Sequence, residues 1–155
     1  MEFDLPDDLL ALRSRARAFV DRDLIPTERE LSQTHRLAPE DRSRLEAGAR
    51  EFDLWNVNLS REFGGPGYGL LARAVIWEEL GRTIALPPRN RGVMGPEVSP
   101  ILFRLTEPQR ERFLYPVLRG EKFACFAQTE PGAGGDPAAM AATAVRDGDV
   151  YVLNG

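Results

Sequence analysis

The sequence has 155 residues, a formal net charge of -4 and 43% hydrophobic residues. This length can bury a core of ordinary size, and the hydrophobic content excludes a chain that is disordered by composition. Phosphate binding requires clustered lysine and arginine, so the mild acidity argues against a nucleic-acid partner.

Three further features point to the class of protein. The only cysteine is Cys125, so an internal disulfide is impossible, which fits a reducing compartment. The first residues lack a basic segment followed by an apolar one, so we expect no signal peptide. No apolar run is long enough to cross a bilayer. We therefore expect a soluble, cytoplasmic protein.

A first helix is predicted over residues 5–24, where Pro6 suits a first helical position. Its apolar residues fall on one face at helical spacing: Leu9, Leu12, Ala16, Phe19 and Val20. Pro26 is expected to end this helix. His35, the only histidine, follows in a polar connector without a second metal-ligating neighbour, so we interpret it as an exposed loop residue.

A second helix is predicted to begin at Pro39, with Leu45, Ala49 and Phe52 as its apolar stripe. Glycines and a proline then dominate residues 62–69, which predicts a loop. This loop is either a tight turn between helices or a close packing contact near a ligand. Composition favours the tight turn.

A third helix is predicted over Leu70–Leu80, with Gly81 as its stop. Because it is apolar on most sides, we expect it to be buried on most sides. Glu78 and Glu79, in its last turn, are candidates for general bases. Structural polar contacts are the favoured interpretation of both.

The next segment contains shorter helices. Residues 87–92 indicate a linker, and residues 98–105 a short fourth helix. Thr106 and Gln109 have the spacing of a capping box at the start of a fifth helix. Pro116 should kink or end that helix, and Gly120 should close it. Five helical segments with short connections predict an antiparallel bundle.

Residues 123–136 combine an apolar run with a glycine loop. The run begins at Phe123 and breaks at Pro131, and its length predicts a buried strand. The glycines that follow let the backbone approach a ligand and direct N–H groups at it. This stretch is where we expect a ligand to bind.

The remaining residues predict β-structure. Residues 143–146 and 150–153 are rich in strand-forming residues, and Asp147-Gly148-Asp149 between them indicates a hairpin. The chain stops at Asn154-Gly155, another turn signal, with three expected strands. Such a sheet has open edges and an uncovered face, so the chain looks truncated. The predicted class is α+β, mainly α: an antiparallel helical bundle followed by the first strands of an antiparallel β-domain.

Several motifs together resemble the acyl-CoA dehydrogenase family. Residues 126–136, Phe-Ala-Gln-Thr-Glu-Pro-Gly-Ala-Gly-Gly-Asp, are similar to its Thr-Glu-Pro-x-Ala-Gly-Ser-Asp motif. Residues 62–67 resemble the family's Gly-Gly-Pro-Gly turn, and residues 77–81 resemble its Glu-Glu-Leu-Gly helix end. Residues 106–109 resemble the segment before its last N-terminal helix. Residues 147–155 resemble its first hairpin. The motifs occur in the same order over essentially the whole chain.

The resemblance implies a fold and a cofactor. Residues 1–120 would form the N-terminal helical domain and residues 121–155 the opening strands of the central β-domain, with the C-terminal helical domain absent. FAD would lie against the β-domain and contact five residues: Phe126, Gln128, Thr129, Gly134 and Gly135. Thr129 would hydrogen-bond the flavin ring. Gly134 and Gly135 would approach the pyrophosphate, and Gly135 would also approach the acyl-CoA substrate.

Two residues depart from the family pattern. The family usually has serine where this chain has Gly135, so any pyrophosphate contact there is limited to the backbone. A neutral hydrogen bond contributes about 0.5–1.5 kcal/mol net, so its loss weakens a flavin site without abolishing it. Gln128 is more polar than the valine or leucine expected there. Both changes are consistent with a subfamily that takes a different acyl group.

The resemblance also implies an activity: oxidation of an acyl-CoA thioester to the 2-enoyl-CoA, with FAD accepting hydride. The glutamate that removes the α-proton would lie beyond residue 155, so no residue of this chain is assigned as catalytic and the chain alone is expected to be inactive. Glu130 would have a structural role. The expected partners are acyl-CoA, an electron-transfer flavoprotein or similar acceptor, and further copies of the full-length protein.

Two other functions are compatible with parts of the sequence. The chain could be a non-catalytic module that binds acyl-CoA or assembles with a partner through an exposed apolar face. Residues 132–135 could instead belong to a phosphate loop of a nucleotide hydrolase. The lysine and the serine or threonine of that motif are missing, and no helix start follows, which argues against this second alternative.

Overall fold

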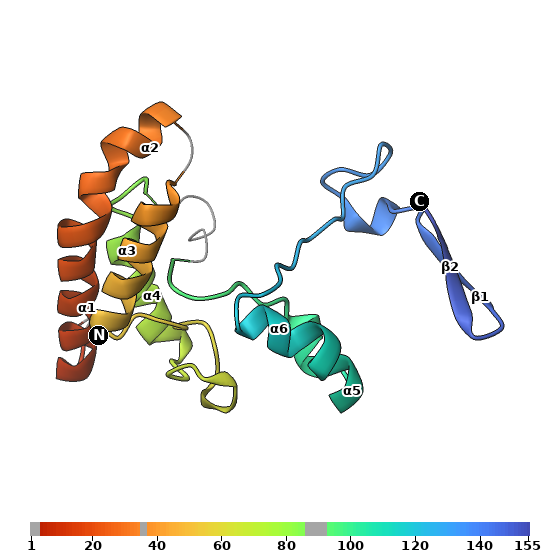
Figure 1. Ribbon diagram of the computed structural model, residues 1–155, viewed down its shortest axis with the longest axis horizontal. Helices are drawn as coiled ribbons and strands as arrows, with labels where there is room; N and C mark the ends of the chain where they lie inside the picture. Colours follow the sequence, from red (N-terminus) through yellow and green to blue (C-terminus); the bar gives the residue numbers. More distant parts are fainter. Residues whose placement is uncertain (1–3, 35–36, 86–92) are drawn as a thin grey trace. The chain divides into compact units, whose positions relative to one another are not determined.

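The computed structural model describes residues 4–34, 37–85 and 93–155. His35 and the linker expected over residues 87–92 lie outside these ranges. The chain divides into two compact units, Met1–Phe123 and Ala124–Gly155, which are described separately below (Figure 1). The first unit is mainly helical, and the second unit contains a single hairpin. This arrangement confirms the predicted α+β class.

The first helical stretch is longer than predicted. Helix α1 spans Asp7–Phe19 and is followed by a π-helical turn at Val20–Leu24 and a 3-10 turn at Ile25–Thr27. Helix α2 then spans Glu28–Thr34. The expectation that Pro26 ends the helix is therefore wrong. A proline ring collides with the carbonyl four residues earlier in a regular α-helix, and the wider π turn makes room for it. The chain thus stays helical through the proline.

Helices α1, α3 (Pro39–Glu51) and α4 (Leu70–Leu80) lie side by side, and α3 runs antiparallel to α1 (Figure 1). The predicted stripe of α1 is confirmed, because Leu12, Ala16, Phe19 and Val20 are buried. Phe52 of the α3 stripe packs on Phe19, with ring centroids 6.0 Å apart. The core is the apolar cluster shared by these helices and the loops between them.

Helix α4 is buried on one side only. Val75, Ile76 and Leu80 are buried, but the side chains of Leu70 and Leu71 are 78% and 57% exposed. The prediction that this helix is buried on most sides is wrong, although its bounds are confirmed. Leu70 and Leu71, at the start of the helix, are not part of the core cluster that α4 shares with α1.

The glycine-rich loop before α4 is a tight turn. Gly65 donates its N–H to the carbonyl of Ser60 at 2.9 Å, and Gly67 donates to the carbonyl of Leu59 at 3.1 Å. A Cβ at Gly65 would overlap the backbone of Leu59. This position therefore requires glycine for close backbone approach. The hydrogen bonds within the segment confirm the tight turn.

The predicted fourth helix is a 3-10 helix, Pro100–Arg104, and the fifth consists of α5 (Glu107–Gln109), a π turn (Arg110–Leu114) and α6 (Tyr115–Leu118). The capping box is confirmed, with the N–H of Thr106 donating to Oε1 of Gln109 at 3.0 Å. The alternative in which Pro116 ends the helix is wrong, since a π turn again precedes the proline. Gly120, at φ 77°, closes the helix as predicted.

Residues 124–155 contain one antiparallel hairpin. Strand β1 (Thr143–Asp147) pairs with β2 (Val150–Asn154), and Asp147 opposes Val150, so Gly148 and Asp149 form the turn. The hairpin is confirmed. The buried strand predicted from Phe123 is not: these residues form no strand, and the side chain of Phe123 is 90% exposed. An apolar run becomes a buried strand only where a neighbouring strand pairs with it, and none does here among the described residues.

Candidate functional site

The centre of the candidate site is a turn at Pro131 and Gly132. Glu130 and Ala133 flank it and exchange both backbone hydrogen bonds, at 3.2 and 3.1 Å. Ala133 is the buried residue of this loop, with 3% exposure. Proline is a residue type that such a turn favours at its first central position. The loop therefore has a defined backbone conformation.

The side chain of Glu130 holds this loop to the residues before β1. Its Oε2 accepts a hydrogen bond from the N–H of Ala141 at 2.7 Å, and its Oε1 accepts from the N–H of Ala142 at 3.0 Å. Both carboxylate oxygens are thus engaged by backbone donors. This geometry supports the structural role that the family resemblance implied for Glu130.

The glycines after the turn leave donors free. Within residues 124–155, the N–H groups of Gly132, Gly134 and Gly135 donate to no protein acceptor. A Cβ added at any of the three would meet no atom within 4 Å. Unpaired amides on an open backbone suit an anionic group such as a phosphate. The loop therefore offers backbone donors that no protein acceptor within residues 124–155 uses.

The other predicted site residues are also accessible. The ring of Phe126 is 71% exposed, Thr129 is exposed, and Gln128 is half-buried. No hydrogen bond within residues 124–155 uses the hydroxyl of Thr129, so it is free to donate to an acceptor on a ligand. The segment thus offers an apolar ring, a hydroxyl and several amides without protein partners. These groups fit an aromatic cofactor that carries phosphates.

The other candidate acids, Glu78 and Glu79, lie on α4. Glu79 is only 2% exposed. Arg17 of α1 donates to both its oxygens, from Nε at 3.1 Å and from Nη2 at 2.7 Å, and Arg82 donates from Nη1 at 3.1 Å. The pKa of Glu79 lies below its usual value, chiefly because Arg17 donates hydrogen bonds to the carboxylate. The hydrogen bond from Arg82 also lowers this pKa, whereas burial raises it. Glu79 is therefore an ionised structural clamp, as the favoured interpretation predicted.

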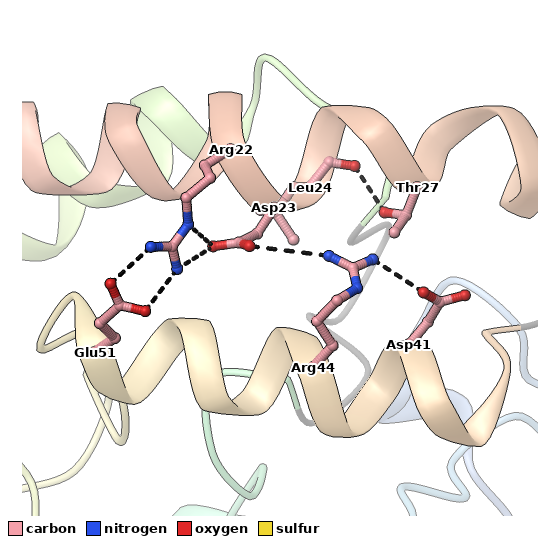
Figure 2. A network of polar contacts seen from close by, with 7 residues as sticks. All are labelled: Arg22, Asp23, Leu24, Thr27, Asp41, Arg44 and Glu51. Carbon is pink, nitrogen blue, oxygen red and sulfur yellow. Dashed lines mark hydrogen bonds and ion pairs between the residues drawn. The ribbon is translucent and has the colours of Figure 1, made fainter.

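A second polar network connects α3 to the π turn after α1 (Figure 2). Arg22 binds Glu51 with both terminal nitrogens, at 2.6 and 2.8 Å, and donates from Nε to Asp23 at 3.0 Å. Arg44 lies 3.8 Å from the other oxygen of Asp23. Every charge in the network is paired with a protein group, which indicates a structural role.

Neither network was evident from the sequence. Arg17 and Glu79 are separated by 62 positions, and Arg22 and Glu51 by 29. Local spacing indicates ion pairs only between residues three or four positions apart on a helix. A glycine within a predicted helix, Gly48, was the one available signal, because a Cβ there would approach Oδ2 of Asp23 to 2.7 Å.

Metal sites and membrane-spanning helices are both absent from the described ranges. In residues 4–34, 37–85 and 93–155 no three histidine, cysteine or acidic side chains gather closely enough to hold a metal ion. Across the same ranges, no helix has the length and apolar character needed to span a membrane. Cys125 is exposed, because the strand expected to bury it does not form.

Comparison with known proteins connects this geometry to a family. The family profile described as "Acyl-CoA dehydrogenase, N-terminal domain" matches residues 6–121. The chain is 34% identical to a 3-(aryl)acrylate reductase of Clostridium sporogenes, over 93% of this chain and 37% of that protein. It is 32% identical to the mitochondrial short-chain specific acyl-CoA dehydrogenase of Bos taurus, over 98% of this chain and 36% of that protein.

A solved structure is also similar over nearly the whole chain. It is an acyl-CoA dehydrogenase of Bacillus anthracis complexed with FAD, with 26% identity and a TM-score of 0.67 over 98% of this chain and 26% of that chain. The chain thus spans well under half the length of each of these proteins. The match of the N-terminal domain profile to most of the sequence shows that the chain belongs to the acyl-CoA dehydrogenase family.

Proposed function

We propose that this chain is the N-terminal portion of a flavin-dependent acyl-CoA dehydrogenase, which oxidises an acyl-CoA thioester to the 2-enoyl-CoA. The observation that carries the proposal is the loop at residues 126–135, where backbone amides and the hydroxyl of Thr129 lack protein acceptors. The FAD-bound relative from Bacillus anthracis supports FAD as the cofactor.

Each predicted site residue has a role in this proposal. The hydroxyl of Thr129 donates a hydrogen bond to the flavin ring, and Phe126 and Gln128 contribute packing and backbone contacts beside it. The amides of Gly134 and Gly135 bind the pyrophosphate, and Gly135 also contacts the acyl-CoA. FAD, when bound, supplies the hydride acceptor, and the protein supplies the position of the reacting atoms.

The proton transfer requires a base that this chain does not supply. Glu79 is committed to Arg17 and Arg82, and both oxygens of Glu130 accept backbone hydrogen bonds. We assign the base to a glutamate outside residues 1–155, so these residues alone are inactive. An electron-transfer flavoprotein as acceptor, homo-oligomeric assembly and a cytoplasmic location complete the proposal.

The test is to express the whole reading frame and measure bound flavin and activity. The purified protein should be yellow and should reduce an artificial electron acceptor when acyl-CoA is added. Thr129→Val keeps the side-chain shape and removes the donor, so it should weaken FAD binding by about 2- to 10-fold. Thr143→Val, at an exposed position of β1, is the matched control and should leave flavin affinity unchanged. A product that binds no flavin contradicts the proposal.

A second candidate function is an assembly or binding module without catalysis. The observation that favours it is the exposure of large apolar side chains on the hairpin, where Tyr151 is 67% and Leu153 is 76% exposed. Apolar surface of this kind is normally covered by other protein. Sedimentation of the 155-residue chain tests this candidate: a clean monomer without affinity for acyl-CoA would exclude it.

A further inference from the structure

A cavity of about 420 Å³ lies in the helical unit, apart from the residues of the proposed flavin site. It is bounded by the turn that precedes α4 and by the 3-10 helix Pro100–Arg104 with the start of the following helix. Its lining includes Ser60, Glu62, Phe63, Phe103, Arg104 and Arg110. This volume is in the range that small-molecule ligands occupy.

Two guanidinium groups line the cavity with unused donors. Arg110 donates from Nη2 to the carbonyl of Phe103 at 2.8 Å, and Nη1 lies 3.7 Å from Glu107. Its Nε is buried and has no hydrogen-bond partner. Arg104 is exposed and makes no hydrogen bond or ion pair within the described ranges. Within the described ranges, Arg104 therefore offers donors without protein acceptors to a ligand in the cavity.

The lining holds two arginines and one carboxylate, Glu62. Arg110 is paired with Glu107 at 3.7 Å, so within the described ranges Arg104 is the lining cation without a protein counter-ion, and an anion can supply one. Arginine forms strong charge-assisted hydrogen bonds with carboxylate and phosphate oxygens. The hydroxyl of Ser60 adds a neutral donor on the same wall.

The remaining wall is aromatic. The rings of Phe63 and Phe103 are 4.6 Å apart between centroids and tilted by 42°. Cζ of Arg110 lies 5.9 Å from the centroid of Phe63, so apolar and cationic surfaces adjoin. A planar apolar group can pack on such rings while its charged end reaches the guanidinium groups.

We propose that this cavity binds a small molecule in which an oxyanion, carboxylate or phosphate, is attached to a planar apolar body. Arg104 and Arg110 bind the oxyanion, and Phe63 and Phe103 contact the planar body. Glu62 limits the affinity by repulsion. None of the lining residues belongs to the proposed flavin-binding segment, Phe126–Gly135.

The test titrates the 155-residue chain with phenyl phosphate, benzoate and inorganic phosphate by isothermal titration calorimetry. Phenyl phosphate and benzoate should bind saturably, and inorganic phosphate at least about tenfold more weakly because it lacks the planar body. Arg104→Gln should weaken phenyl phosphate binding by about tenfold or more. Arg29→Gln, at an exposed position of α2, is the matched control and should have no effect. Glu62→Gln should tighten binding.

The opposite signs expected for Arg104→Gln and Glu62→Gln separate a ligand site from a loss of folding, since a folding defect would weaken binding in both. Absence of saturable binding at millimolar phenyl phosphate overturns the proposal. Equal losses in Arg104→Gln and Arg29→Gln also overturn it, because they would show non-specific charge attraction. Equal affinity for inorganic and phenyl phosphate overturns the assignment of the aromatic wall.

Discussion

The two compact units satisfy their polar and apolar groups in different ways. In the helical unit the charged side chains of α1, α3 and α4 pair with one another over a continuous apolar core. In residues 124–155 the strands are exposed along their whole length, and amides of the glycine loop lack protein acceptors. Paired groups such as Arg17 and Glu79 contribute to the stability of the helices that carry them. A region with free donors and exposed rings is organised to contact something else.

The largest expected contrast is between two phenylalanines. Phe19→Ala removes a fully buried ring from the core and should lower the free energy of unfolding by about 3–5 kcal/mol. Phe126→Ala removes a ring that is 71% exposed and should change it by less than about 0.5 kcal/mol. Denaturant unfolding followed by helical circular dichroism measures both. Similar losses in the two variants would remove the distinction between the units.

Two glycines sharpen the same comparison. A Cβ at Gly48 would lie 2.7 Å from Oδ2 of Asp23 and 3.1 Å from the ring of Phe19, so Gly48→Ala should destabilise the chain by about 1–3 kcal/mol. Gly132→Ala meets no atom within 4 Å and should be neutral within about 0.5 kcal/mol. Thermal unfolding of both variants is the measurement. A neutral Gly48→Ala would show that the packing around Asp23 is loose.

The buried clamp on α4 predicts a pH dependence. Glu79→Gln should cost about 2 kcal/mol at pH 7, because Arg17 and Arg82 lose an ionised partner while remaining half-exposed. The folded pKa of Glu79 lies below its ordinary value of 4.5, so its contribution is fully present above that pH. This stabilising contribution is lost as pH falls through the folded pKa of Glu79. The difference in free energy of unfolding between the unsubstituted protein and Glu79→Gln should therefore shrink in that pH range.

Glu78→Gln is the matched control, because Glu78 is the exposed neighbour on the same helix. It should change the free energy of unfolding by less than about 0.5 kcal/mol at any of these pH values. Urea unfolding at pH 7 and below pH 4.5 measures both variants. A pH-independent effect of Glu79→Gln would mean that packing, and not charge, accounts for its cost.

The smallest expected effect is at Gly135. Gly135→Ser introduces the hydroxyl that the family pattern usually carries, and the added Cβ meets no atom within 4 Å. Stability should stay within about 0.5 kcal/mol, while FAD affinity of the whole protein should rise by about 2- to 10-fold through one added hydrogen bond. Fluorescence titration with FAD measures this. Unchanged or weaker affinity would argue against a pyrophosphate contact at Gly135.

Sequence patterns correctly predicted the elements that are determined by residues close together in the sequence. The bounds of α4, the capping box at Thr106 and the hairpin at Gly148 follow from periodicity and turn residues within a few positions. The errors at Pro26 and Pro116 share one cause. In both cases a π turn ends two residues before the proline and admits its ring, and no propensity reports that adjustment.

The errors with long-range causes could not have been avoided from local patterns. Burial of an apolar run depends on whether another segment covers it, which explains the exposure of Phe123 and of Leu70 on α4. The Arg17–Glu79 clamp depends on how α1 and α4 pack. The candidate flavin residues came from the motif at residues 126–136, and the structure adds that their donors are free. Their roles toward FAD remain predictions.

The most direct measurement of the central claim is amide hydrogen exchange across residues 123–136 of the protein expressed from the whole reading frame, with and without FAD. Without FAD, the amides of Gly132, Gly134 and Gly135 should exchange rapidly, because they donate to no protein acceptor in this structure. With FAD, they should become protected while exchange in α1 and α3 stays unchanged. Bound FAD without added protection in this segment would contradict the account.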